Sequence, residues 1–454
     1  MNSNPTTEQN VYLAAYFTEQ NLYLAAYFVI SLIAWCLTNE ATAHASRWLN
    51  NQIAFGEFSI SLRITHNLAH LFVMGQEATL LMYLSKYHAN PEKKSGLIYW
   101  IAQSTLIKTV ILIITVSCTL IFSSLYPEEY NNISITLPIL NTSINMPSQQ
   151  LLTIFFAMPF IVISGIFERF FLFLKRFFSA FLPRGVYQPI LFSTLLYCLP
   201  QNMTPNVISA LIIYCVSFIM SSIIYALFSY YSGFSISAKK DLSDKKTWHA
   251  SGLLYTLSTL IIKGTPSLSL FFLKQLGPVE NVVGFYAAIA TLNYGFHLLT
   301  KPFDSYLKPS IATLYHQGQI QELQDKINQI NKLRWLIILT LTLTLAIAGH
   351  YLLGRYGEDF PLYYSGLVIA SVLSCCQYLG QLAHETLNYT NNQSTLSKIM
   401  LFQLILIALC AKILIPKFGL IGAIISQGLP CALCTFLSAY MLRKKTGLKV
   451  YFAF

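Results

Sequence analysis

Apolar runs of about 20 residues follow one another along the whole chain, and this pattern constrains the fold more than any motif. A helical run of this length matches the hydrocarbon thickness of a bilayer. In lipid, only helices and closed barrels satisfy every backbone polar group. The sequence therefore predicts an all-α, polytopic membrane protein with about 12 transmembrane helices, at 21–41, 57–85, 97–124, 150–174, 180–198, 207–231, 249–273, 283–314, 335–353, 361–384, 399–415 and 419–441.

The composition agrees with this interpretation and narrows the partners. Hydrophobic residues make up 55% of the chain and charged residues only 10%, whereas about a quarter of the residues in a soluble domain are charged. The net charge of +11 does not indicate nucleic acid, because the basic residues form no single patch and no nucleic-acid-binding module surrounds them. We expect membrane lipids, and no nucleic acid, as partners.

The distribution of the basic residues predicts the topology. Of the 29 Lys and Arg residues, 18 fall in the termini and loops on one side of the predicted spans and five on the other. The positive-inside rule therefore places both termini in the cytoplasm. Residues 1–20 contain most of a tandem repeat, TEQNVYLAAYF followed by TEQNLYLAAYF, and we expect them to form a cytoplasmic N-terminal extension at the membrane interface.

A second, weaker repeat predicts the domain organisation. Residues 55–88 align without gaps on residues 283–316, matching Gly56 with Gly284 and Tyr87 with Tyr315. Each copy is followed by a basic loop and another span. This pattern indicates two parallel six-helix lobes. We place the N-lobe at 21–231, a cytoplasmic linker at 232–248, the C-lobe at 249–441 and a cytoplasmic tail at 442–454.

The predicted span 283–314 carries a polar stripe along one face. At about 100° per residue, its polar and charged side chains project within an arc of about 80°. Charges in hydrocarbon are costly, so such a stripe predicts a helix that lines a wet cavity. Alternatively, the last lysine extends to the interface, while the lysine and the aspartate before it neutralise each other across one turn. The stripe consists of Asn293, His297, Lys301, Asp304 and Lys308.

The equivalent span of the first lobe has a polar face of its own. Arg63, His66, His70 and Glu77 project within about 60° of one another. Either histidine alone is better explained as a satisfied interior group, whereas four such groups on one arc favour a cavity wall. Lys263 lies deep in the seventh span, where a glycine and a proline interrupt the helix, and is a further candidate for the cavity wall.

The remaining charged residues within or at the ends of spans show less order. Lys108 has no clear polar arc around it, so a buried partner explains it as well as a cavity does. Glu168 and Arg169 are interpreted as an interfacial pair near the end of the fourth span, and His384 and Glu385 occupy a similar place in the tenth.

Several stretches resemble polysaccharide flippases of the multidrug/oligosaccharidyl-lipid/polysaccharide exporter superfamily, in its O-antigen (Wzx-type) branch. The resemblance covers most of residues 21–445 and consists of diffuse glycine and aromatic patterns. It implies two six-helix lobes around a central cavity that opens alternately to each side of a bacterial inner membrane. The stretches include FGEFSISLRITHNLAHLFVMGQEATLLMYLSKYH, VVGFYAAIATLNYGFHLLTKPFDSYLKPSIATLY, GEDFPLYYSGLVIASVLSCCQYLGQLAHETLNYTNNQS and FGLIGAIISQGLPCALCTFLSAYMLRKKTG.

What the resemblance implies about function is transport, not catalysis. The expected substrate is an undecaprenyl-pyrophosphate-linked oligosaccharide for lipopolysaccharide synthesis, and the expected partners include polysaccharide polymerase and ligase machinery. Basic groups in a low-dielectric cavity suit the pyrophosphate. The candidate substrate-binding residues are Arg63, His66, His70, Lys263, Asn293, His297, Lys301 and Lys308, with Glu77 and Asp304 as charge partners or ion-coupling groups.

Two other functions remain open at this stage. A cation-coupled multidrug antiporter of the same superfamily would place the acidic groups at the centre of the site. A membrane glycan enzyme would need a catalytic acid in an external loop, where Glu128 and Glu129 are the candidates. The chain lacks a phosphate-binding GxxxxGK[ST] loop, so it has no ATPase of its own. No cofactor or metal is expected beyond a coupling proton or sodium ion.

Overall fold

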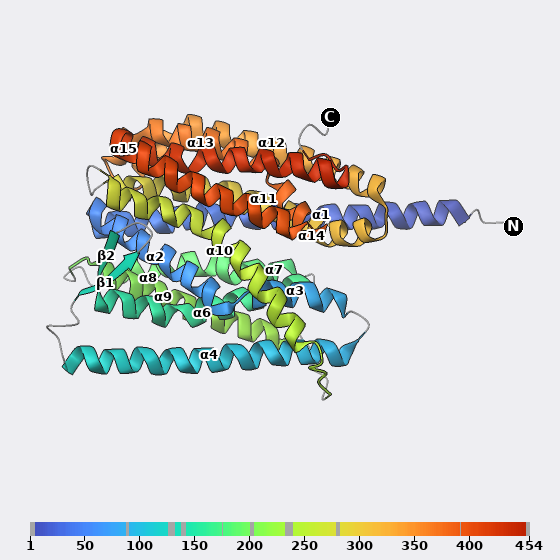
Figure 1. Ribbon diagram of the computed structural model, residues 1–454, viewed down its shortest axis with the longest axis horizontal. Coiled ribbons are helices and arrows are strands. Elements are labelled where there is room, and N and C mark those ends of the chain that lie inside the picture. Colours follow the sequence, from blue (N-terminus) through green and yellow to red (C-terminus); the bar gives the residue numbers. More distant parts are fainter. Residues whose placement is uncertain are drawn as a thin grey trace.

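The computed structural model describes residues 5–87, 90–125, 132–137, 142–174, 176–199, 204–231, 239–277, 282–390 and 392–450. In these ranges the chain is a bundle of long helices with one small hairpin at its edge (Figure 1). The first half contains α1 (Pro5–Leu49), α2 (Gln52–Val73), α3 (Gln76–Lys86), α4 (Pro91–Leu125), α6 (Ser148–Phe173), α7 (Phe177–Leu182), the π-helical η1 (Pro183–Tyr187), α8 (Gln188–Tyr197) and α9 (Val207–Tyr231).

The second half contains only helical elements in its described residues, joined by short turns and loops. Its elements are α10 (Lys245–Leu276), α11 (Val282–His316), α12 (Ile320–Gly354), the short 3₁₀ turn η2 (Phe360–Tyr363), α13 (Tyr364–Gly380), α14 (Leu382–Tyr389) and α15 (Gln393–Thr446). The element α15 consists of two helices, because Gly419 interrupts it with a φ of 53°.

The predicted all-α membrane fold is confirmed. Within the described residues, eight helices are long and apolar enough to cross a membrane. The twelve predicted spans correspond to the helices when α2 with α3, α7 with α8, and α13 with α14 each count as one span and α15 counts as two. The protein is therefore a multi-pass membrane protein.

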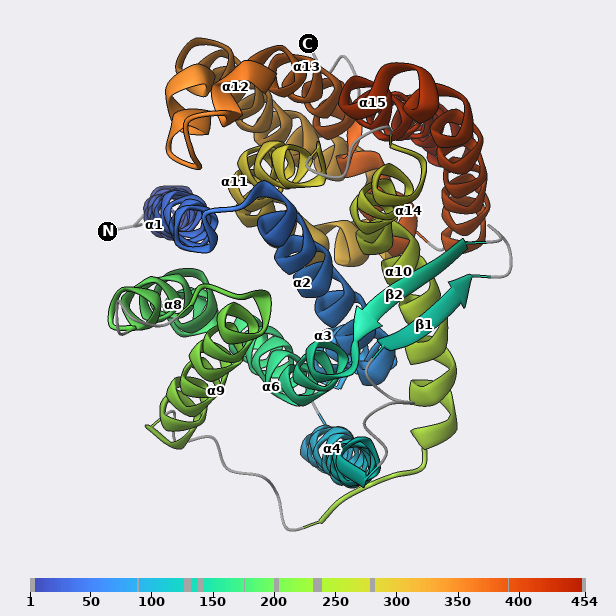
Figure 2. The same cartoon turned by 90° about the vertical axis from the view of Figure 1, so that its left-hand side faces the viewer.

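The helices form two groups that meet along α1, α2, α10 and α11. Viewed along the bundle, α6, α8, α9 and α4 lie on one side, and α11, α12, α13 and α15 on the other (Figure 2). Helix α11 packs against both α1 and α2, while α10 packs against α2 and α3 as well as α15. The contact between the predicted lobes thus involves chiefly the first two helices of each half.

The two glycines that the internal repeat aligns with each other meet in space. A Cβ atom on Gly56 of α2 would lie 3.0 Å from the backbone nitrogen of Gly284 of α11, and a Cβ atom on Gly284 would lie 2.3 Å from the carbonyl oxygen of Gln52. Only glycine allows two helix backbones to approach this closely. Equivalent helices therefore touch at equivalent positions, as expected for two lobes related by a pseudo-twofold axis.

Polar contacts connect the two groups near the same end of the bundle. Arg355 Nη2 lies 2.7 Å from Glu40 Oε1, and Gln52 Nε2 donates to Asp359 Oδ2 at 2.8 Å. These side chains are exposed, so each contact stabilises this end of the bundle only weakly.

The second predicted span is broken, and the prediction of one continuous helix over 57–85 was wrong. Met74 and Gly75 have φ values of 49° and 67° and separate α2 from α3. Gly75 is required there, because a Cβ atom would lie 2.1 Å from the carbonyl oxygen of Gly252 in α10. The repeat aligns Met74 with Pro302, and α11 stays helical through that proline.

Three further segments differ from the expectations. Helix α1 is continuous from Pro5 and extends beyond the bundle, so the N-terminal extension continues the first span instead of turning along the membrane surface (Figure 1). No helix-breaking residue follows Pro5 to turn it. Helix α12 begins at Ile320, so residues 320–334 are helical and not a loop. Strands β1 (Asn132–Leu137) and β2 (Thr142–Pro147) form an antiparallel hairpin within the predicted external loop.

Candidate functional site

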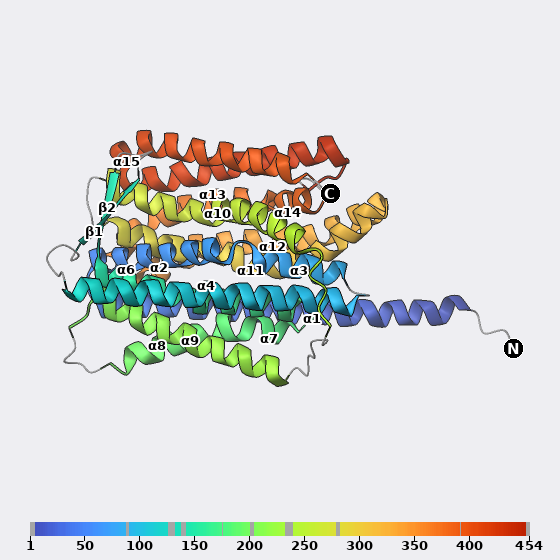
Figure 3. The same cartoon turned by 60° about the horizontal axis from the view of Figure 1, so that its bottom comes forward.

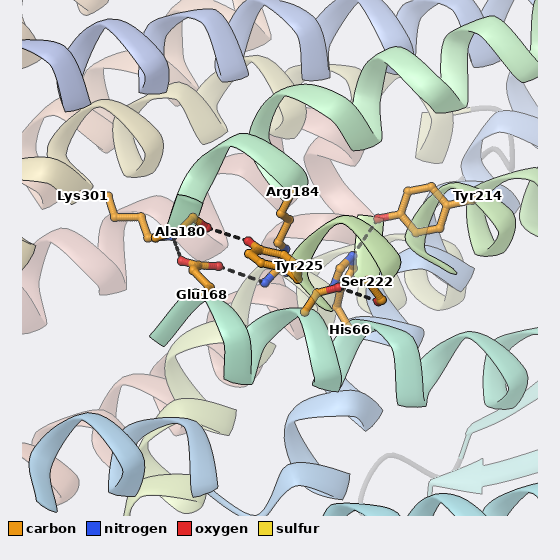
Figure 4. Close-up of polar contacts among 9 residues, drawn as sticks. His66, Glu168, Ala180, Arg184, Tyr214, Ser222, Tyr225 and Lys301 are labelled. Atoms are coloured by element: carbon orange, nitrogen blue, oxygen red, sulfur yellow. Dashed lines mark hydrogen bonds and ion pairs between the residues drawn. The ribbon is translucent and has the colours of Figure 1, made fainter. Parts of the chain in front are cut away.

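A buried carboxylate lies where the two groups of helices meet. Glu168 of α6 is only 4% exposed, and its Oε1 atom lies 2.5 Å from Nζ of Lys301 in α11. Its other oxygen lies 3.5 Å from Nη1 of Arg184, in the π-helical segment η1 (Figure 4). Because α6 and α11 belong to different predicted lobes, this ion pair joins the lobes in the interior of the protein.

Two aromatic side chains, Phe181 and Tyr225, lie beside this cluster. The ammonium of Lys301 lies 4.6 Å from the ring centroid of Phe181 in α7, a cation–π distance. Tyr225 of α9 donates to the carbonyl oxygen of Ala180 at 2.5 Å (Figure 4). This bond ties α9 to α7, immediately before the π-helical turn. π-helical turns are rare and are frequent at functional sites.

Asp304 does not pair with Lys301, contrary to the alternative interpretation of the stripe. Its Oδ1 atom lies 3.2 Å from Nε of Arg334 in α12. Arg334 is fully buried, whereas the sequence had placed it in a cytoplasmic loop. A buried guanidinium requires a carboxylate partner, and Asp304 supplies it within the C-lobe.

Lys308 also has a partner in its own lobe. Its Nζ atom lies 3.1 Å from Oε1 of Glu385 in α14. The charged part of the α11 stripe therefore divides in two: Asp304 and Lys308 bind neighbouring helices of the C-lobe, and Lys301 reaches across to the N-lobe.

Arg63 of α2 faces the other lobe without an acidic partner. Within the described part of the chain no carboxylate forms an ion pair with it, and its electrostatic neighbours are the hydroxyls of Tyr286 and Tyr294 on α11. Tyr286 in turn donates to Gln427 of α15. Arg63 is thus a guanidinium between the lobes with its charge uncompensated by the described side chains.

The other residues of the predicted α2 face do not form one stripe. His66 Nε2 lies 2.8 Å from the hydroxyl of Tyr214 in α9 (Figure 4). His70 is buried. This agrees with the alternative of satisfied interior histidines. Glu77 follows the break after α2, so it does not share their face; its carboxylate lies over Gly165 of α6.

The remaining candidates are placed as follows. The Nδ2 atom of Asn293 donates to the carbonyl oxygen of Ile289 in its own helix. The ring of His297 lies 5.4 Å from that of Tyr294. Lys263 belongs to α10, but its side chain lies outside the described residues, as do Glu128 and Glu129. In the described ranges, no group of three His, Cys, Asp or Glu side chains could hold a metal ion.

Sequence reasoning did not single out Arg184 and Arg334, and it noted Glu168 and Glu385 only as charged residues near the ends of spans. The sequence signal that could have identified them is an ionisable residue within an apolar run, because such a residue needs an oppositely charged or polar partner in the protein interior. Glu168 carried this signal, but its closeness to the end of the run favoured an interfacial position.

Comparisons with known proteins agree on the fold. No protein-family model matches the chain, and no curated protein matches it in sequence. A MATE protein solved in complex with MaL6 is 14% identical, with a TM-score of 0.70 over 94% of this chain and 96% of the other.

Two further structures extend the comparison. An inward-facing multidrug resistance MATE family transporter of the MOP superfamily is 13% identical, with a TM-score of 0.68 over 92% and 98%. A MOP superfamily transporter from Pyrococcus furiosus, described by a binding pocket of reverse polarity, is 14% identical, with a TM-score of 0.64 over 94% and 95%. The chain therefore has the fold of the MATE transporters of the MOP superfamily.

Proposed function

We propose that the protein is an alternating-access transporter that moves an anionic, lipid-linked oligosaccharide across the membrane. The observation that carries this proposal is the surplus of positive charge between the lobes. Lys301 and Arg184 share the single carboxylate of Glu168, and Arg63 has no carboxylate in the described part of the chain.

A pyrophosphate supplies the missing negative charge. Uncompensated cations in a low-dielectric interior are costly, so the empty site favours an anionic ligand. Guanidinium groups such as Arg63 and Arg184 bind phosphate oxygens with two parallel hydrogen bonds, which adds geometric selectivity. The apolar tail of the same substrate stays in lipid, while the lobes shelter its polar part.

The ion pair between Lys301 and Glu168 provides a link between binding and movement. It joins α11 to α6, so separation of the lobes at this depth requires that it break. A bound pyrophosphate would replace Glu168 as the partner of Lys301 and so lower the cost of separation. A ligand shifts a conformational equilibrium only through such a difference in contacts between two states.

The comparisons favour a second candidate, a cation-coupled multidrug antiporter. One of the reported neighbours is a multidrug resistance transporter. In that case Glu168 would carry the coupling proton or sodium ion. The neighbour from Pyrococcus furiosus is described as having a binding pocket whose reverse polarity suggests a different function. We therefore give the charge between the lobes more weight than the shared fold.

A transport assay separates the two candidates. Purified protein in liposomes is given a fluorescent undecaprenyl-pyrophosphate oligosaccharide, and its appearance in the opposite leaflet is followed with a membrane-impermeant quencher; efflux of a cationic dye is measured in parallel. We expect movement of the lipid-linked sugar, slowed at least about tenfold by Arg63→Gln, which removes a charge-assisted contact. The control is Arg443→Gln at the exposed end of α15. Dye efflux without movement of the anionic lipid would refute the proposal and support the antiporter.

A further inference from the structure

A small groove opens on the outside of the bundle where α10 crosses the N-lobe, away from the site around Glu168. It lies between α3, α4 and α10 and has a volume of about 240 Å³. Figure 3 shows α4 along the outer side of the bundle, and Figure 2 shows the same helix end-on at the edge. The residues used below are Met74, Gln76, Trp100, Lys108, His249 and Leu253.

The groove faces lipid. Leu253 of α10 is 66% exposed, and Leu106 and Ile107 of α4 are 64% and 50% exposed. Large apolar side chains exposed on the side of a membrane protein contact acyl chains. The inner wall is rigid, because Gln76 is buried and its Nε2 atom donates to Ser104 Oγ of α4 at 2.8 Å.

Lys108 places a positive charge in this apolar setting. Beyond the first turn of α4, every other residue up to Leu125 is uncharged. In the described part of the chain, no carboxylate forms an ion pair with Lys108. An ammonium exposed to hydrocarbon is costly unless it reaches water or an anion.

The other polar groups around the groove also favour an anion. His249 packs edge-on against Trp100, with ring centroids 4.7 Å apart, and Lys245 precedes it by one helical turn. Asp244, at the start of α10, is already occupied, because Lys93 and Tyr87 donate to it at 2.8 and 2.6 Å. The groove therefore combines one lysine, Lys108, and the ring of His249 with an apolar rim.

We propose that this groove binds the phosphate of an anionic phospholipid from the surrounding leaflet, with Lys108 as its main contact and His249 as a second polar contact. The acyl chains would lie against Leu253 and the exposed face of α4. Lys108 lies within the predicted span 97–124, and a lysine in a span extends its long side chain toward the headgroup region, where a lipid phosphate is the available anion. Basic residues near a membrane surface attract anionic lipids. This goes beyond the proposed function, since it concerns a resident lipid and not the transported substrate.

The position of the groove gives such a lipid a structural role. Met74, at the break between α2 and α3, lines the groove, and the neighbouring Gly75 contacts the backbone of Gly252 in α10. A bound lipid would therefore contact both lobes where α10 crosses the N-lobe.

Native mass spectrometry of the full-length protein tests the proposal. The protein is titrated with phosphatidylglycerol or phosphatidylcholine in detergent, and an apparent Kd is obtained from the fraction that retains lipid. We expect Lys108→Gln to weaken retention of phosphatidylglycerol about tenfold, equivalent to about 1.4 kcal/mol. Lys108→Arg keeps the charge and should retain the lipid.

The controls separate the groove from general attraction to anions. Lys398→Gln removes an exposed lysine from the start of α15 and should leave retention unchanged. Inorganic phosphate at millimolar concentration should not displace the lipid, because the acyl chains contribute to binding. Equal retention of the two phospholipids, unchanged retention in Lys108→Gln, or full displacement by inorganic phosphate would each overturn the proposal.

Discussion

The ion pair between Lys301 and Glu168 allows a quantitative test of the contact between the lobes. Removing one partner of a buried pair costs about 3–5 kcal/mol, because the other charge is left uncompensated. The side chains of Lys301 and Glu168 are 22% and 6% exposed, so the pair is largely buried. After Lys301→Gln, Glu168 keeps Arg184 at 3.5 Å, and we expect a loss of about 2 kcal/mol, below that range.

The reverse change should be more costly. Glu168→Gln leaves both Lys301 and Arg184 without their shared carboxylate, so we expect about 3–5 kcal/mol. Combining it with Lys301→Gln removes one of the two orphaned cations. The double variant should therefore be less destabilised than the sum of the single variants by about 1–3 kcal/mol.

Thermal unfolding of the purified proteins in one detergent provides the measurement. We expect Glu168→Gln to unfold at a lower temperature than Lys301→Gln, and the double variant to lose less than the two changes added together. Lys274→Gln is the matched control, because Lys274 contacts Glu57 across the lobes at 3.4 Å and both side chains are about a third or more exposed. It should cost at most about 1 kcal/mol. Strictly additive effects of Lys301 and Glu168 would refute the pairing.

Three further predictions test the close contact, the linker and the topology. Gly284→Ala places a methyl group against the α2 backbone and should slow transport and lower the unfolding temperature, whereas Gly264→Ala, with open space around it, should have little effect on either. A hydrogen bond from an α4 lysine holds the pKa of Asp244 below its usual range, so its contribution to stability is present above about pH 4 and lost below; Asp244→Asn should flatten the acid limb of a stability profile. Cysteines at Lys245 and Arg443 should resist an impermeant thiol reagent in intact cells and react after lysis; labelling of intact cells would contradict the cytoplasmic assignment.

The helices were predictable because the property that defines them is local. Each apolar run contains its own length and hydrophobicity, and the backbone has no alternative to helix in lipid. The break between α2 and α3 was not predictable in this way. It places Met74 in the left-handed region, which is uncommon for any residue other than glycine, and no proline marks it.

The pairing of charges was harder to predict than their positions. The spacing of Lys301 and Asp304 suits an ion pair along one helix, and such a pair contributes a few tenths of a kcal/mol at a surface. Arg334 is fully buried and would lose far more without a carboxylate, so Asp304 turns to it. Arg334 belongs to another helix, and a helical wheel of α11 shows only which residues of α11 share a face, not which residues of other helices lie opposite them.

The division of the α11 charges separates rigid pairs from a pair that can switch. Asp304 with Arg334 and Lys308 with Glu385 lie within one lobe, so a rigid-body movement of the lobes leaves them intact. Lys301 with Glu168 spans both lobes and must lengthen if they part at that depth. A carboxylate shared by two cations lowers the cost of that step, because Glu168 keeps Arg184 when Lys301 leaves. The released Lys301 ammonium then needs an anion, and in our proposal the substrate provides it. Without substrate this ammonium would be left uncompensated, so movement of the lobes without substrate is disfavoured.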